Sequence, residues 1–517
     1  MKKHVFRNRR MRYGGMTVLL TVLVITVTVL FNAVFSTLAE RHQWYTYSVK
    51  EIDYRVTEAS YGILADAFAE AKEAGREDRV RVLFCDLDTN VVANETLRYV
   101  YMTATLLAEQ FPEHIAVECH DIWSDPTSVR PYTKTVDPVT GEETESAITS
   151  TCVILVAGDY YRVYTLQEFY VFKEGDANQL WAYNGEKKLT AGLLRAVGER
   201  KANAYIITNH GETFYDYEML YLLDDAGYRI SYIDLYKEKI PADCDLLVSY
   251  NPTADLAHDG LSAISEVEVL EEYLSHDGKQ LMVFLGNASP SLPNLEAFLS
   301  EWGFAFDYAT DTVGGGTYRY MIQDAAQSLT SDGYTIYGDA VLRGPSGELL
   351  EGLSRSNVFK NATSMHAAQG YVSQGESGSY QKGDRTLLSL YEAGESSVAW
   401  ANGRAVADGD GRMLLGVTEQ SRGGATSRVA VASSCEFAAE SFLQSAVYGN
   451  TDTLLRLCRV FGMEHLPEGL TIKPFDTASI SMITTSQMLA WTLTLTLTPA
   501  ILLTVIAAVV LIKRRRA

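Results

Sequence analysis

Residues 203–233, NAYIITNHGETFYDYEMLYLLDDAGYRISYI, contain the pattern that decides the fold class. The apolar run at 203–208 is typical of a buried strand, and residues 215–226 place apolar side chains at helical spacing before Gly227, which suits a helix end. A second strand-like run follows at 228–233. Strand, helix and strand in this order predict parallel strands joined by a right-handed crossover.

The same alternation extends along the chain on both sides. Further strands are expected at 79–85, 114–119, 244–250, 280–285 and 427–432, and further helices at 55–74, 95–110, 188–200, 265–275 and 451–461. Helices between strands of this kind cover both faces of a parallel sheet. We therefore predict the α/β fold class, with tandem α/β domains and mostly parallel sheets.

Two regions depart from this alternation. Residues 124–150 are rich in Pro, Thr, Ser and acidic residues and are expected to form a long exposed loop after which a hairpin spans 151–164. Between about 310 and 430, strand-like runs and glycine turns dominate, which predicts a β-rich insertion. Within it, residues 403–407 and 412–417 flank a glycine turn and are expected to pair as a hairpin.

An uncharged apolar segment stands near each end of the chain. Residues 16–38 would form a helix of about 34 Å, enough for a hydrocarbon core of roughly 30 Å. The segment within 488–512 is equally free of charge, with Trp491 near one end and Pro499 as a kink that a membrane helix tolerates. We predict two transmembrane helices. The alternatives are a cleaved signal peptide for the first, although its apolar core is too long, and a buried helix for the second.

Charge fixes the expected orientation of these segments. The first twelve residues carry six Lys or Arg, and the last five carry four. Because basic flanks stay in the cytoplasm, both termini are predicted to be cytoplasmic and the bulk of the chain extracytoplasmic. The remainder holds 34 basic and 65 acidic residues, which disfavours nucleic acid as a partner.

The predicted organisation follows from these boundaries. It consists of a cytoplasmic basic tail at 1–15, a transmembrane helix at 16–38, an extracytoplasmic α/β domain at 39–187, a second one at 188–487 with the β-rich insertion near 310–430, a transmembrane helix at 488–512 and a basic tail at 513–517.

The sharpest local motif is Asn209-His210-Gly211-Glu212, which follows the strand at 203–208. Ligand sites of open α/β sheets lie at such strand ends, and a following helix offers free N–H groups to an anion. His210 could act as a general base oriented by Glu212. The structural alternative, which we favour, is that Gly211 makes the turn while Glu212 lies near the helix dipole. The motif is therefore a candidate ligand or interaction turn without an assigned catalytic residue.

Other motifs have structural interpretations. Ser433-Ser434-Cys435-Glu436 follows a buried strand but lacks a G-x-S-x-G pattern, and Gly314-Gly315-Gly316 lacks the ending of a P-loop. Asp86/Asp88 and Asp243/Asp245 offer too few oxygens for calcium. The six cysteines are widely spaced, which does not support zinc and favours buried thiols over disulfides. No cofactor or metal is expected.

The order of parts resembles the GldG family, the gliding-motility-type auxiliary proteins of ABC transporters. The resemblance covers nearly the whole chain, and Asn209 replaces the first glycine of a G-H-G-E-like turn. It rests on LTAGLLRAV (189–197), AYIITNHGE (204–212), LLDDAGY (222–228), IPADCDLLV (240–248) with Asn251-Pro252, EYLSHDGKQL (272–281), PNLE (293–296), EWG (301–303) and, more weakly, GNTD (449–452).

The resemblance implies a non-catalytic subunit that works with an ABC permease and a cytoplasmic ATPase, and with membrane lipid around its helices. Two alternatives remain. One is a membrane-anchored extracytoplasmic hydrolase that uses His210 and Glu212. The other is a transmembrane sensor, which the short cytoplasmic tails disfavour.

Overall fold

The computed structural model describes residues 52–475, apart from gaps at 77–78, 138–141, 146, 174–175, 199–201, 215, 258–264, 277, 287–290, 311–316, 376–377, 402–403 and 409–410, together with residues 493–494. Both predicted membrane segments, except for those two residues, and the triple glycine at 314–316 lie outside the described residues. Among the helices that the structure does describe, none is long and apolar enough to cross a bilayer. The two anchors therefore stay predictions.

The first sheet has the strand order β2-β1-β5-β6. Strands β1 (Val80–Phe84) and β2 (Ile115–Cys119) are parallel, whereas β5 (Val153–Ala157) runs antiparallel to β1 and to β6 (Tyr160–Tyr164). The predicted β-α-β unit and the following hairpin are therefore confirmed. Only one of the three strand pairs in this sheet is parallel, so the sheet is mixed and the expectation of a mostly parallel sheet is wrong here.

Three helices pack against the first sheet: α2 (Glu58–Glu73), α4 (Leu97–Gln110) and α5 (Gly185–Val197). Thr57 caps α2, because its side chain accepts a hydrogen bond from the amide of Ser60. Leu64 and Phe68 of α2 enter the core beside Leu193 of α5. The apolar spacing at 55–74 and 188–200 thus predicted both helices, with ends displaced by a few residues.

The predicted loop at 124–150 is partly ordered into secondary structure. It contains a short 3₁₀ helix, η1 (Pro126–Tyr132), and a small hairpin of β3 (Lys134–Val136) and β4 (Glu143–Glu145). The expectation of a loop throughout was wrong: residues 134–136 and 143–145 pair as antiparallel strands despite their polar composition. A short helix, α3 (Asp88–Ala93), follows β1, and η2 (Leu166–Phe169) follows β6.

A separate three-stranded sheet brings together distant parts of the chain. Its order is β27-β8-β7, where β7 (Tyr170–Lys173) and β8 (Asp176–Tyr183) form a hairpin. The third strand, β27 (Lys473–Pro474), pairs with the end of β8.

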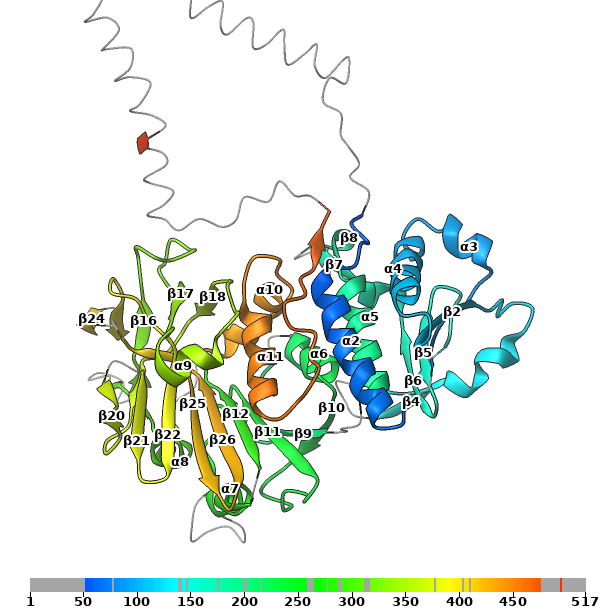
Figure 1. Ribbon diagram of the computed structural model, residues 1–517. Coiled ribbons are helices and arrows are strands. Elements are labelled where there is room, and N and C mark those ends of the chain that lie inside the picture. The colour runs from blue at the N-terminus through cyan, green and yellow to red at the C-terminus, as the bar shows by residue number, and fades with distance from the viewer. Residues whose placement is uncertain are drawn as a thin grey trace, which may run out of the picture. The chain divides into compact units, whose positions relative to one another are not determined.

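The large second sheet is parallel in one half and antiparallel in the other (Figure 1). Its parallel strands, in spatial order, are β10 (Tyr228–Ile233), β9 (Ala202–Ile207), β11 (Cys244–Tyr250), β12 (Gln280–Phe284) and β26 (Ala425–Ala432). The sheet continues with antiparallel β25 (Met413–Arg422), β22 (Arg385–Glu392), β17 (Thr335–Ala340) and β18 (Asn357–Lys360). The molecule is therefore a mixed α/β protein whose sheets contain parallel strands.

Helices cover the two faces of this sheet. One core contains Met219 of α6 (Glu218–Asp225) and Leu454 of α11 (Asn450–Val460). The other core contains Leu270 of α7 (Glu266–Ser275) and Phe298 of α8 (Pro293–Glu301). Burial of both faces explains the nearly continuous apolar runs of the central strands.

The β-rich region at 310–430 is confirmed, but its predicted hairpin is not. Strand β24 (Arg404–Asp408) pairs with β23 (Val398–Ala401) and not with β25. The reason is burial: Met413, Leu414 and Leu415 at the start of β25 lie in the main cores, where β22 and β26 flank them.

The remaining elements, in this region and on either side of it, are short. They are β13 (Phe304–Phe306), β14 (Tyr308–Thr310), β15 (Thr317–Arg319), β16 (Met321–Gln323), α9 (Gly344–Leu349), β19 (Met365–Ala367), β20 (Val372–Ser373), β21 (Ser379–Lys382), η4 (Cys435–Ala438) and α10 (Glu440–Leu443). All six cysteines are unpaired; Cys119 is half-buried and the other five are buried.

Candidate functional site

The motif at 209–212 lies at the carboxyl end of β9, on the edge where the parallel strands of the second sheet end. Asn209 (φ 80°) and Gly211 (φ 70°) both adopt the left-handed backbone region, which reverses the chain within a few residues. A Cβ at Gly211 would collide with Thr253 Oγ1, so the turn requires glycine. The carbonyl oxygen of His210 accepts hydrogen bonds from the amides of Thr253 and Ala254, both at 2.8 Å. The turn is therefore fastened to the loop that follows β11.

The His210 side chain lies between two carboxylates. Its Nδ1 is 3.2 Å from Glu212 Oε1, and its Nε2 is 3.0 Å from Glu266 Oε1. The His210 amide donates to Glu212 Oε2 at 2.7 Å, and the Ala257 amide donates to Glu266 Oε2 at 2.6 Å. The three side chains are at most 6% exposed. We call His210, Glu212 and Glu266 the His210 clasp.

This geometry favours the protonated imidazole. Burial alone would lower the pKa of His210, but hydrogen bonds from its ring nitrogens to Glu212 and Glu266 outweigh burial and raise that pKa to about 10. The ring is then a cation at neutral pH with both nitrogens donating. A general base needs a free nitrogen lone pair, so the clasp does not supply the base that the hydrolase alternative requires.

The helix after the turn differs from the expected one. We expected it over 215–226, but α6 begins at Glu218. The interpretation that Glu212 lies near the helix dipole is wrong, because Glu212 folds back onto His210 instead. Because α6 begins only at Glu218, the turn also does not place the N–H groups of a helix N-terminus around an anion.

Sequence reasoning missed Glu266, which stands 56 residues after His210. It occupies the first turn of α7, where Ser265 caps the helix by accepting from the amide of Glu268. An acidic residue at that position already has an explanation in the helix dipole. The signal of a second role is its near-complete burial, at 2% exposure. Burial depends on the tertiary fold, so the sequence alone could not reveal it.

The other sequence candidates are structural. Cys435, in η4, is 2% exposed, its amide donates to the Leu285 carbonyl, and its own carbonyl accepts from the Tyr250 hydroxyl at 3.0 Å. Glu436 pairs with Lys360 at 2.6 Å, so it is not placed to activate Cys435. The segment after β26 is thereby hydrogen-bonded to the residue that follows β12.

The two aspartate pairs serve local hydrogen bonding. Asp86 accepts from Asn90 Nδ2 at 2.8 Å. Asp245 accepts from the Asn203 amide at 2.9 Å, and Asp243 accepts from Asn203 Nδ2 at 3.3 Å. Asp86, Asp243 and Asp245 therefore fasten strand ends and turns, and Asp88 lies in the first turn of α3.

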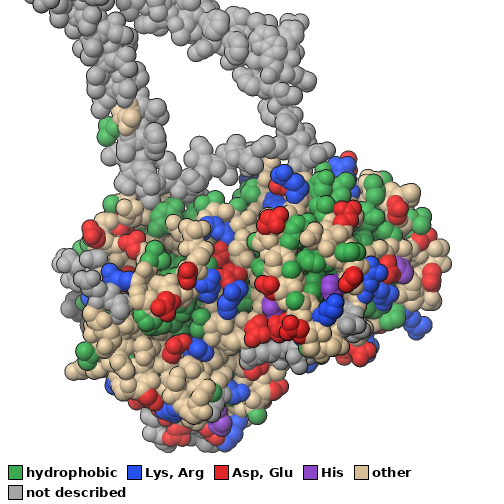
Figure 2. Space-filling model, viewed as in Figure 1, with side chains coloured by type: hydrophobic (Ala, Val, Ile, Leu, Met, Phe, Trp, Pro, Cys, Tyr) green, Lys and Arg blue, Asp and Glu red, His purple; other side chains and the backbone are tan. Residues whose placement is uncertain are grey.

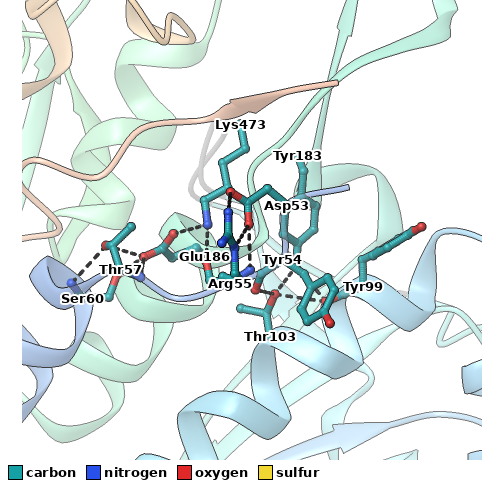
Figure 3. A network of polar contacts seen from close by, with 10 residues as sticks. All are labelled: Asp53, Tyr54, Arg55, Thr57, Ser60, Tyr99, Thr103, Tyr183, Glu186 and Lys473. Atoms are coloured by element: carbon teal, nitrogen blue, oxygen red, sulfur yellow. Dashed lines mark hydrogen bonds and ion pairs between the residues drawn. The ribbon is translucent and has the colours of Figure 1, made fainter. Parts of the chain in front are cut away.

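A second buried charge, at Glu186 in the first turn of α5, was not anticipated from the sequence (Figure 3). Its Oε1 accepts from the Thr57 amide at 2.7 Å, from Thr57 Oγ1 at 2.6 Å and from Ser60 Oγ at 2.6 Å. Its Oε2 is 2.7 Å from Lys473 Nζ. Burial by itself would raise the pKa of Glu186, but these partners lower it below its ordinary value. We call these four residues the Glu186 clasp.

The Glu186 clasp joins the two ends of the described fold. Lys473 also donates to the Arg55 carbonyl, and Thr103 Oγ1 donates to the Tyr54 carbonyl at 2.9 Å (Figure 3). On the carboxyl side, the Phe475 amide donates to the Trp181 carbonyl at 3.0 Å. Residues 53–57 and 473–475 are thus held beside one another.

No family model and no curated protein sequence matches the chain. Among solved structures, that of PurLQS from Thermotoga maritima is similar over 50% of this chain and 98% of the other, with 13% sequence identity and a TM-score of 0.25. At that TM-score the likeness carries no inference about this chain.

Proposed function

We propose that the protein is a non-catalytic auxiliary subunit of an ABC-type transport system, anchored in the membrane at both ends and contacting other components through its extracytoplasmic region. The observation that carries this proposal is the Glu186 clasp. It holds the segment that follows the first apolar stretch against the segment that precedes the second. Two anchors would then leave the folded region from one place.

The lengths of the connecting segments suit such an arrangement. Residues 39–51 and 476–487 separate the clasped ends from the two apolar stretches. A dozen residues extend to at most about 45 Å, and the two tethers are nearly equal in length. A subunit held in this way presents its region at a limited distance from the bilayer, where extracytoplasmic parts of a permease would lie.

Three further features support a role in contact rather than in chemistry. His210, the one residue proposed as a general base, is held as a cation by Glu212 and Glu266. Acidic and basic side chains are interspersed over the face seen in Figure 2, which suits polar contacts with other proteins. The resemblance to the GldG family points to the same role.

The test is purification of the full chain from native membranes in mild detergent, followed by identification of the proteins that accompany it. A permease and an ATPase are expected in stoichiometric amounts. A matched sample in which residues 488–517 are replaced by the membrane helix of an unrelated protein should lose both. Recovery of the chain without either component would overturn the proposal.

Topology supplies an independent check. A fluorescent protein that matures only in the cytoplasm, fused after Ala517, should fluoresce. Alkaline phosphatase, which folds only outside the cytoplasm, should be active when it is fused after Phe475. The opposite pair of results would contradict the placement of the folded region.

A further inference from the structure

A cavity of about 930 Å³ lies where the first sheet and its helices meet the second. Its walls come from β6, η2 and α5 on one side and from α6, β10 and α10 on the other, and the β3–β4 hairpin contributes to its rim. Its volume is within the range of small-molecule sites. We call it the junction cavity.

The cations in its wall are mostly neutralised by the protein itself. Arg162 Nη1 is 2.8 Å from Asp224 Oδ2, and Arg195 pairs with the other oxygen of the same carboxylate. Lys188 Nζ is 2.7 Å from Asp225 Oδ2. These pairs fix the wall and leave little positive potential to attract an anion.

Two acceptor side chains in the cavity wall have fewer partners than the cations do. Asn184 is 5% exposed and lines the cavity, and its Oδ1 has no hydrogen-bond partner among the described residues. Glu218 Oε2 accepts from Gln444 Nε2 at 2.7 Å, but Glu218 forms no ion pair with any residue that the structure describes. A buried acceptor without a donor costs about 1–3 kcal/mol, so Asn184 Oδ1 would gain from a ligand that donates, and Glu218 would gain a cationic partner.

Two properties of the lining decide the sign of that ligand. Acidic side chains outnumber basic ones by seven to five. Tyr160 and Tyr170 add aromatic rings, whose faces attract cations, whereas Lys188 Nζ already lies over the Tyr221 ring, 6.0 Å from its centroid. Burial, which the nearby Lys188 and Lys187 only partly offset, raises the pKa of Glu218 to about 7, as expected for a carboxylate that lacks a strong cationic partner.

We propose that the junction cavity binds a ligand through an alkylammonium group, with the Glu218 carboxylate and Asn184 Oδ1 as its acceptors. The ammonium is a free small amine or a lysine side chain of a peptide. Because its walls come from both α/β regions, an occupied cavity links the two. The site does not depend on the proposed transport role.

The test is calorimetric titration of the full chain in detergent with two probes, 1,5-diaminopentane and the capped peptide acetyl-Ala-Lys-Ala-amide. At least one should bind with a dissociation constant near or below about 1 mM. Binding of both means that the ammonium group is sufficient, and binding of the peptide alone identifies a peptide ligand. Uncharged 1-pentanol, the matched neutral probe, should not bind.

Two variants locate the site. Glu218→Gln should weaken binding at least tenfold and Asn184→Ala about threefold or more, because each removes one acceptor. Glu145→Gln, which removes an exposed carboxylate from the hairpin outside the cavity lining, should leave binding unchanged.

Folding does not obscure these results. Glu218→Gln keeps a side-chain oxygen that can accept from Gln444, and Asn184 makes no side-chain cap to α5. Both variants should therefore melt close to the wild type. The proposal is overturned if neither probe binds the wild type at a probe concentration of roughly 10 mM, ten times the expected dissociation constant. It is also overturned if 1-pentanol binds as well as the amines, or if Glu218→Gln binds the probes as tightly as the wild type does.

Discussion

The His210 clasp and the Glu186 clasp are built alike with opposite charges. In the first, a buried cation lies between two carboxylates, and in the second a buried anion accepts from two hydroxyls, an amide and an ammonium. The first joins the turn after β9 to the first turn of α7, whereas the second joins the two ends of the described fold. The difference teaches that burial of a charge does not by itself indicate catalysis. In each clasp the buried charge is bound by partners from another segment of the chain, so it fastens those segments together.

The largest effect is expected from His210→Gln. It leaves Glu212 and Glu266 buried without a cation, which costs about 3–5 kcal/mol. The midpoint of thermal unfolding of the full chain in detergent should fall by roughly 5–10 °C. His276→Gln, at an exposed histidine whose ring Nδ1 lies 2.7 Å from the Glu272 carbonyl oxygen of its own helix, is the matched control and should change the midpoint little. Equal midpoints for both variants would mean that the clasp is not a stabilising cation site.

A smaller effect is expected from Glu186→Gln. The amide removes the ion pair with Lys473 and turns a donor toward Thr57 or Ser60, at a cost of about 2–3 kcal/mol. Because the clasp holds the chain ends, amide hydrogen exchange should rise at residues 53–57 and 473–475 and stay unchanged around His210. Glu58→Gln, at an exposed position of α2, is the control. Faster exchange throughout the protein, or none at the ends, would contradict the assignment of a local tether.

The sequence predicted the parts of both clasps that depend on periodicity. Apolar spacing located β9, α5 and α7, and Asn209 with Gly211 indicated the sharp turn. The partners could not be predicted, because they are distant in sequence: Glu266 is 56 residues from His210, and Glu186 is 126 residues from Ser60. A single sequence contains no signal for such pairs.

The errors in the fold have the same origin. The predicted hairpin of 403–407 with 412–417 was wrong because a glycine-containing turn favours pairing with the nearest strand, whereas β24 pairs with β23, and β25 with β22 and β26. Burial in the large cores decided the actual partners. Local pattern therefore predicted element type well, and tertiary contacts decided which elements meet.

The opposite charges of the clasps predict opposite responses to pH. The pKa of His210 is raised to about 10, so its stabilisation is complete below its ordinary pKa of about 6.5 and is lost as pH rises toward 10. The pKa of Glu186 is lowered, so its stabilisation is complete above about pH 4.5 and is lost as pH falls through the folded-state pKa.

Melting of wild type and variants across pH tests this contrast. Between pH 7 and 9 the difference between wild type and His210→Gln should shrink by about 2–3 kcal/mol, whereas the difference for Glu186→Gln should stay constant. Below about pH 4 the difference for Glu186→Gln should shrink instead. Parallel changes for the two variants would show that general charge repulsion, and not the individual clasps, governs the response.

The smallest effect is expected at an ion pair that lacks burial. Glu70 of α2 pairs with His465 across the two α/β regions, but the Glu70 side chain is 49% exposed and that of His465 is 27% exposed. An exposed pair is stabilised little by Coulomb attraction and is screened by salt, so Glu70→Gln should cost at most about 0.5 kcal/mol. Its effect should vanish in roughly 1 M salt, where the Debye length is about 3 Å, whereas that of His210→Gln should persist. If Glu70→Gln lowered the free energy of unfolding as much as Glu186→Gln does, the position of an ion pair between the two α/β regions, and not burial of its charge, would determine how much it stabilises the fold.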